Sequence, residues 1–223
     1  MSVIIGVLLI TLVVIELSIR SSTSYSELIT NPTKFTSRSI CGANSKTLCT
    51  LGSRGPAGGI IFYVDSLNRY PNFDYLEIAP PGWNGGNSLV DPTFIWCSDI
   101  SHRIITDVDN WANRQLGRGE KNTEFLLKEC DSGIASALRA FNASSRSKYH
   151  DWFIPSVGEM DLIINNLQGE SGLTPTEYWT SSEFSESGAW AESVGHGYQG
   201  SATKQTTFAV RPIRSVSYTH LRA

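Results

Sequence analysis

Residues 151–159 read Asp151-Trp152-Phe153-Ile154-Pro155-Ser156-Val157-Gly158-Glu159. Ser156 stands three residues before Glu159, and this spacing is typical of a capping box, in which each side chain binds the other residue's backbone N–H. Apolar residues then recur at helical spacing at Met160, Ile163, Ile164 and Leu167. The stretch therefore predicts a short extended segment, residues 151–155, that leads into a helix closed by residues 169–175.

Apolar runs on both sides of this helix predict strands. Ile60–Val64 is an unbroken β-branched and aromatic run, which favours a strand covered on both faces. Further strands are predicted over 75–79, 177–182, 189–194 and 207–214, and the two central runs have the spacing of paired strands. Pro212 lacks a backbone donor, so the last strand should lie at an edge or carry a bulge there.

A second helical pattern covers residues 121–142. Asn122 or Thr123 can cap its start, and Gly133 is expected to kink or split it. Residues 82–119 are rich in Gly, Asn and Asp and predict mainly loops. The expected fold class is therefore α+β, a mixed domain of short, mainly antiparallel strands with two helices and long loops.

Composition and charge limit the classes of function. The 223-residue chain is 40% hydrophobic with a formal net charge of −3, which fits one folded domain and gives no electrostatic reason to expect nucleic acid. Val3–Ile15 is an apolar run of signal-peptide length, with small residues at 22–24 as a weak cleavage site. We expect residues 1–24 to be a signal peptide or membrane anchor, the alternatives being a missing upstream start or a buried core helix.

Residues 25–51 are expected to be a tether. The chain is then secreted or held at the cell surface, and it contacts a membrane only through its N-terminal segment. Four cysteines in an oxidising compartment indicate disulfides, and three connectivities are open. We favour Cys41–Cys49 and Cys97–Cys130. The sequence contains no CxxC motif and no adjacent Cys/His pair, so no motif indicates a zinc site.

Several segments together resemble the bacterial Lcl C-terminal domain family, named for a collagen-like surface adhesin. The resemblance covers about residues 52–215 and rests on the segments 58–63, 119–123, 151–156 with Glu159, 178–183, 189–190 and 210–214. It implies a C-type-lectin-like fold, related in architecture to formylglycine-generating enzymes, and a role in adhesion or ligand binding. In such a fold the first and last strands, here Ile60–Val64 and Phe208–Arg214, pair with each other.

Residues 216–223 match the translation of a transposon-type sequencing adapter, so we expect them to be an artefact that packs against nothing. His220 is therefore left out of every site argument.

Chemical motifs for catalysis are absent from the sequence. There is no Gly-x-Ser-x-Gly or phosphate-binding loop, and His102, His150 and His196 stand apart from the cysteines. Formylglycine chemistry would have to use Cys97 and Cys130, which match no such motif. Residues 107–110 cluster oxygen ligands but lack a calcium-loop spacing. We expect no enzyme activity, metal or cofactor.

The tryptophans divide into core and loop candidates. Trp152, Trp179 and Trp190 fall on predicted strands and are expected in the core. Trp83 and Trp111 lie in polar loops, and the Gly-rich segment after Glu192 carries His196, Tyr198 and Gln199. Aromatic, polar and glycine-rich loops are what adaptable binding surfaces use. We therefore predict a ligand-binding patch of Trp111, His196, Tyr198, Gln199 and Trp83, with Trp111 and the 195–200 loop on a common face.

The leading hypothesis is an exported, adhesin-like module that binds a glycan or protein ligand without covalent chemistry. The alternatives are a structural component of the envelope or an appendage, and an enzyme of the formylglycine-generating architecture. A second copy of the chain, in a homo-oligomer, is a further candidate partner.

Overall fold

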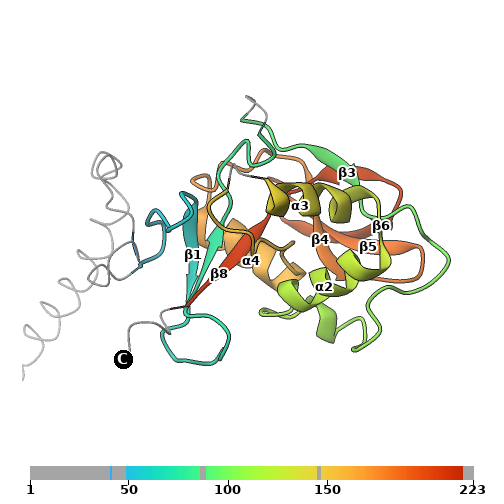
Figure 1. Cartoon of the computed structure of the whole chain (residues 1–223), viewed down its shortest axis with the longest axis horizontal. Helices are drawn as coiled ribbons and strands as arrows, with labels where there is room; N and C mark the ends of the chain where they lie inside the picture. The colour runs from blue at the N-terminus through green and yellow to red at the C-terminus, as the bar shows by residue number, and fades with distance from the viewer. Residues whose placement is uncertain (1–40, 42–48, 86–88, 145–146, 218–223) are drawn as a thin grey trace, which may run out of the picture. The chain divides into compact units, whose positions relative to one another are not determined.

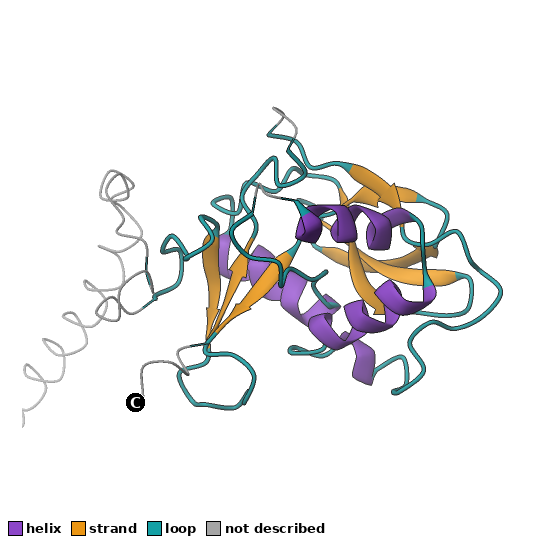
Figure 2. Cartoon of the chain, viewed as in Figure 1, coloured by secondary structure: helices purple, strands orange, loops and turns teal. Residues whose placement is uncertain are grey.

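The computed structural model describes residue 41 and residues 49–85, 89–144 and 147–217. These ranges belong to one unit, Ser39–Ala223, and form an α+β domain (Figures 1 and 2). The strands are β1 Ile60–Val64, β2 Tyr75–Ile78, β3 Thr93–Ile95, β4 Glu177–Glu183, β5 Gly188–Ser193, β6 Tyr198–Thr203, β7 Thr207–Ala209 and β8 Ile213–Val216. The helices are α2 Gly119–Glu129, α3 Gly133–Ala143 and α4 Val157–Leu167, and a short 3-10 helix, η2, spans Ala112–Arg114.

Five strands form the larger sheet in the order β3-β7-β4-β5-β6. All neighbours are antiparallel except β4 and β7, which run parallel. The predicted pairing of 177–182 with 189–194 is confirmed as β4–β5, with a register shift between Trp179 and Glu183. Tyr198–Gly200, predicted as loop, instead begins β6 and pairs with β5.

The smaller sheet has the order β1-β2-β8 and is wholly antiparallel. The expectation that the first and last strands pair is wrong, because β2 lies between them: Ile78 faces Ile60 of β1 on one side and Ile213 of β8 on the other. β2 is buried along its whole length. Backbone pairing on both edges, with a register shift between Ile61 and Tyr63 on the β1 side, makes it the centre of this sheet.

The predicted last strand is divided between the two sheets. β7 belongs to the larger sheet and β8 to the smaller one, and Pro212 lies in the crossing. Arg211 fixes this crossing from a fully buried position. Its guanidinium donates to Asp91 Oδ1 at 2.6 Å and to the carbonyls of Ala79, Ser171 and Gly172. A buried cation with each of its three guanidinium nitrogens bonded to oxygen holds the two sheets at one fixed junction.

The helix after residue 151 forms as predicted. Ser156 caps α4, with its side chain accepting from Glu159 N, and Glu159 accepts in return from Ser156 N at 2.7 Å. The other helical pattern is two helices rather than one, so three helices are described instead of two. Gly133, with φ +56°, begins α3, where a Cβ would lie 2.2 Å from Ile95 O. Neither Asn122 nor Thr123 caps α2, because that helix already begins at Gly119.

α4 packs between the two sheets, where Met160, Ile163 and Leu167 meet Phe62 of β1 and Tyr178 of β4. α2 and α3 cover the opposite face of the larger sheet. This second core contains Trp96, Trp152 and Trp179, so the core placement of Trp152 and Trp179 is confirmed. Trp190 is only partly buried and points away from that core.

Both favoured disulfides, Cys41–Cys49 and Cys97–Cys130, are present. Cys41 and Cys49 are buried against Ile61 and Tyr75, so this part of the expected 25–51 tether packs on the domain.

The far end of the domain also departs from expectation. Val216 pairs with Tyr75 and is buried, which makes it wrong that the last eight residues pack against nothing. Ser217 Oγ donates to Asn72 O, and residues 218–223, like the predicted leader 1–24, lie outside the described residues. Within the described ranges no helix is long and apolar enough to cross a membrane.

Candidate functional site

The loop that carries Trp111 is fastened to the larger sheet by Glu183, the last residue of β4. This carboxylate is fully buried and accepts from Ile104 N at 2.8 Å and from Ile105 N at 3.0 Å. Lys204 Nζ, also fully buried, lies 2.7 Å from it. A buried carboxylate matched by a cation and two N–H groups is a strong attachment point. The long loop is therefore a rigid support for whatever it displays.

A short turn then sets the direction of Trp111. Asp109 Oδ1 accepts from Trp111 N at 2.9 Å and from Ala112 N at 2.7 Å, which satisfies the first amides of η2. Asn113, fully buried, donates to Glu183 O at 3.0 Å and pins the other side of the turn. With both sides of the turn held, the Trp111 indole stays 69% exposed.

Arg114 joins Trp111 to the β4–β5 hairpin. Its guanidinium carbon lies 4.0 Å from the Trp190 ring centroid and 5.3 Å from that of Trp111. Phe184, 41% exposed, meets Trp190 edge to face at 5.3 Å. Together with Gln199, these residues form a continuous row of rings and guanidinium, called here the Arg114 surface. Such cation–π contacts stabilise each pair by about 0.5–2 kcal/mol, depending on exposure.

Gln199 links the Arg114 surface to α4. Arg114 Nη2 donates to Gln199 Oε1 at 2.5 Å, and Gln199 Nε2 donates to Asp161 Oδ2 at 2.7 Å. Asp161 in turn shares a hydrogen bond with Glu192 of β5. Burial, and then the neighbouring Asp161 carboxylate, raise the pKa of Glu192 to about 9. Glu192 therefore holds a proton at neutral pH and can donate it to Asp161.

The same place collects polar atoms without partners. Within the described residues, Arg114 Nε, Trp190 Nε1 and Glu192 Oε1 are buried and form no hydrogen bond. Each such atom costs free energy relative to a satisfied one. Native proteins tolerate this cost most often where a site serves a purpose other than stability.

The predicted five-residue patch is divided by the strand pleat. Tyr198 and Gln199 are successive residues of β6, so their side chains point to opposite faces of the sheet. Gln199 lies with Arg114, whereas Tyr198, 55% exposed, lies with His196, their rings 6.4 Å apart. His196 Nδ1 is 3.2 Å from Ser193 Oγ. The structure thus brings Trp111 and Gln199 together and places His196 and Tyr198 as a second group.

Trp83 does not belong to either group. It is 4% exposed, donates from Nε1 to Val210 O at 2.9 Å, and packs edge to face on Phe141. It therefore fills the core beneath a Gly-rich turn and lies apart from the exposed patch in which it was predicted. Trp190 is the reverse case, since it was expected in the core and lies in the Arg114 surface.

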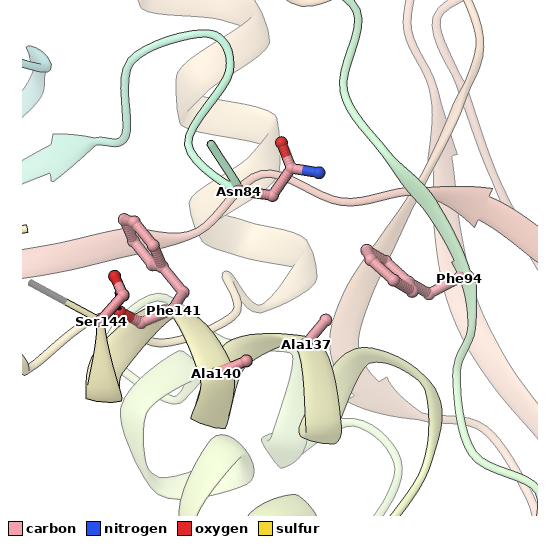
Figure 3. A pocket seen from close by; sticks show the side chains of 6 residues that line it. All are labelled: Asn84, Phe94, Ala137, Ala140, Phe141 and Ser144. Atoms are coloured by element: carbon pink, nitrogen blue, oxygen red, sulfur yellow. Dashed lines mark hydrogen bonds between the residues drawn. The ribbon is translucent and has the colours of Figure 1, made fainter. Parts of the chain in front are cut away.

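Two hollows flank Trp83 and its neighbour Phe141. One has a volume of about 260 Å³ and lies along α3 (Figure 3), where it is lined by Asn84, Phe94, Ala137, Ala140, Phe141 and Ser144. The other, of about 300 Å³, lies between Pro56, Pro80, Trp83 and Trp152, with Lys148 at its side. Their linings are mainly apolar, with few polar groups to fix a ligand's orientation. They rank behind the Arg114 surface as a candidate site for that reason.

The acidic residues of the Trp111 loop have structural partners. Asp107 forms an ion pair with Arg118 at 2.8 Å, and Asp109 caps η2. Across the described ranges, no three His, Cys, Asp or Glu side chains are grouped so that they could hold a metal ion.

Sequence reasoning missed Arg114, Phe184, Asp161 and Glu192. Arg114 lies three residues after Trp111, which is the spacing at which side chains meet on a helical turn, and this was the available signal. Nothing in the sequence near Asp161 indicates Glu192, because α4 and β5 are joined only by the fold.

The fold of this chain has a likeness among solved structures. No family model matches the chain, and no curated protein matches it either. A solved structure described as a fimbrial protein from Bacteroides ovatus superposes with a TM-score of 0.52 at 15% identity. The match covers 71% of this chain and 44% of that chain, so this chain spans less than half of the neighbour's length. At this identity the likeness concerns the fold.

Proposed function

We propose that this chain is an exported, adhesin-like binding module that recognises a glycan or protein ligand at the Arg114 surface without covalent chemistry. The observation that carries the proposal is Trp111, a large aromatic side chain left 69% exposed on a turn that is fastened at both sides. Trp and Arg dominate binding hot spots, and a preorganised turn binds with less loss of conformational entropy.

Three further features support export and a surface role. Two disulfides within one domain are typical of proteins that leave the reducing cytosol. The Bacteroides ovatus neighbour carries the description of a fimbrial protein. The third feature is the resemblance of residues 52–215 to the Lcl C-terminal domain family. The C-type-lectin-like fold that this resemblance implies is part of the same proposal.

A structural role in an appendage is the second candidate, and the fimbrial neighbour favours it. In that case the partner of the Arg114 surface is another subunit of the assembly. An enzyme of the formylglycine-generating architecture has less support, because Cys97 and Cys130 are joined in a disulfide and are 1% and 2% exposed.

The test is binding of the purified chain to glycan and matrix-protein arrays, followed by affinity measurement for the strongest hit. Trp111→Ala should lower affinity at least tenfold, and Arg114→Ala should do the same through loss of the contacts to both tryptophans. Leu67→Ala is the matched control, since Leu67 is 66% exposed but lies in the β1–β2 connection.

Tyr198→Ala decides which face of β6 binds. Unchanged affinity would limit the site to the Arg114 surface, and lost affinity would extend it around the strand. If Trp111→Ala and Leu67→Ala bind equally well, the proposal is wrong.

A further inference from the structure

The four outer edges of the two sheets differ in how they are protected. At β1, Gly52 N donates to Ile61 O and Ile61 N donates to Ser53 O, so residues 52–53 cover the edge. At β8, Phe153 and Ile213 exchange two backbone hydrogen bonds of 2.8 Å. β3 is only three residues long and follows Pro92. Covering segments, short strands and proline are the usual means of preventing strand addition.

β6 has none of these protections in the described structure. It ends the five-stranded order, and β5 is the one described strand that pairs with it, over six consecutive residues without a bulge. Tyr198–Thr203 contains neither proline nor a charged residue. A regular, uncharged edge of this length is a template for another strand.

The ladder shows which backbone groups are free to accept such a strand. Lys204 N donates to Ser187 O, and in an antiparallel pair the hydrogen-bonded positions alternate. Tyr198, Gly200 and Ala202 therefore direct their backbone groups to β5. Gln199, Ser201 and Thr203 direct theirs outward, and of these groups Thr203 O already accepts from Thr206 N at 2.9 Å.

We propose that β6 pairs antiparallel with β6 of a second copy of this chain, with Ser201 on the two-fold axis. In this register Ser201 meets its own counterpart and exchanges both backbone hydrogen bonds with it, and Thr203 N can donate to the partner's Gln199 O. Because the strand carries no charge, self-pairing brings no like charges together. On the other face Gly200 meets the partner's Ala202, and these two small residues leave room for the Tyr198 ring, which a Cβ at Gly200 would meet at 3.8 Å.

The pairing has a consequence for binding. A two-fold axis through Ser201 runs perpendicular to the sheet, so each sheet keeps the same face on the same side. The two Arg114 surfaces then face one way and can engage a repetitive ligand together. Strand pairing does not depend on what the Arg114 surface binds, so either proposal can fail while the other stands.

Sedimentation equilibrium of the full chain over a range of protein concentrations tests the pairing. The contact is smaller than a standard protein interface, so we expect reversible, concentration-dependent dimers rather than permanent ones. Ser201→Lys places two cations opposite each other and should abolish the dimer while the thermal midpoint stays unchanged. Ser66→Lys is the control: Ser66 is exposed in the β1–β2 connection and should leave dimerisation intact.

A thiol crosslink locates the contact. Ser201→Cys, treated with a short bifunctional thiol reagent under non-reducing conditions, should yield covalent dimer faster than Ser66→Cys by at least tenfold. A wild-type chain that is monomeric at every concentration overturns the proposal. Dimers that persist in Ser201→Lys, or equal crosslinking of the two cysteine variants, overturn it as well.

Discussion

Glu183 and Glu192 lie on the two strands of one hairpin, β4 and β5, and both are nearly or fully buried, yet their surroundings are opposite. Glu183 meets the Lys204 ammonium and two backbone N–H groups. Glu192 meets another carboxyl, Asp161, and its Oε1 has no partner among the described residues. The first arrangement holds a loop to the sheet, whereas the second stores unfavourable free energy beneath the Arg114 surface.

Burial alone therefore does not determine the role of a glutamate in this protein. Charge complementarity at Glu183 makes the region dependent on that side chain. At Glu192 burial and the Asp161 carboxylate outweigh the charge of Arg114, so the protein keeps a proton there and stability depends on pH. The candidate binding surface lies over the less satisfied of the two.

The largest effect should come from breaking the Glu183 attachment. Glu183→Leu leaves the Lys204 ammonium buried without a counter-charge, and we expect the free energy of unfolding to fall by about 3–5 kcal/mol. Chemical denaturation at pH 7 measures it. Adding Lys204→Met removes the orphaned cation and should restore a large part of the loss. If Glu183→Leu alone lowers the free energy of unfolding by less than about 1 kcal/mol in this measurement, Glu183 and Glu192 do not differ as described.

The second effect concerns pH. The folded-state pKa of Glu192 is raised to about 9 from 4.5, so between those values the unfolded state releases a proton that the folded state keeps. Stability therefore falls as pH rises through this window, by up to about 1.4 kcal/mol per pH unit for one group. Burial also raises the pKa of Glu159, to about 7, so its contribution fades above that pH and Glu192 dominates over Glu159 as the pH approaches 9. Glu192→Gln should flatten the decline there in denaturation experiments, and an unchanged slope would contradict the assignment.

A third buried glutamate, Glu159, differs from both Glu183 and Glu192. Among the described residues Glu159 has no cation beside it, but its carboxylate accepts from Gly117 N, Gly119 N and Ser156 N, and its own N–H donates to Ser156 Oγ. Ser156→Ala should cost about 0.5–2 kcal/mol, and its combination with Glu159→Ala should cost less than the sum of the two changes. Thermal denaturation of the two single variants and the double variant tests this. Strict additivity would mean that the capping box does not act as a unit.

The smallest effect is expected at the outer surface. Trp111→Ala removes a mostly exposed indole, so stability should change by no more than about 0.5 kcal/mol, as for Leu67→Ala. Thermal midpoints of the two variants, measured side by side, give the answer. A large loss in Trp111→Ala alone would make the residue part of the folding core rather than of a binding surface.

Local signals predicted the elements better than their neighbours in space. The capping box at Ser156, the β1 run and the β4–β5 pair follow from spacing over a few residues, and all are present. The pairing of β1 with β8 failed because β2 could enter between them, and no local pattern records which strand is central. The missing backbone donor of Pro212 predicts the break in the last strand. It does not predict that the two parts of that strand join different sheets.

The candidate site was predicted only in its exposed part. Trp111 and Gln199 were found because polar, glycine-rich surroundings favour exposure, although Gln199 lies on β6 and not in the predicted loop. Trp83 has the same surroundings and is buried, because Val210 and Phe141 happen to lie beside it. Arg114, Trp190 and Glu192 act through contacts between η2, β5 and α4, which only the tertiary structure brings together.

The Cys97–Cys130 disulfide gives the Trp111 turn a mechanical property. Trp111 lies inside the loop of chain that this bond closes, between positions 33 residues apart. A force applied to the Trp111 indole can extend only the enclosed segment, because the covalent bond passes the load to the chain before Cys97 and after Cys130, which is to β3 and α3. The surrounding strands are then shielded from being peeled away one by one. For the binding proposed at the Arg114 surface, this closed loop favours an attachment that resists force and does not simply persist at equilibrium.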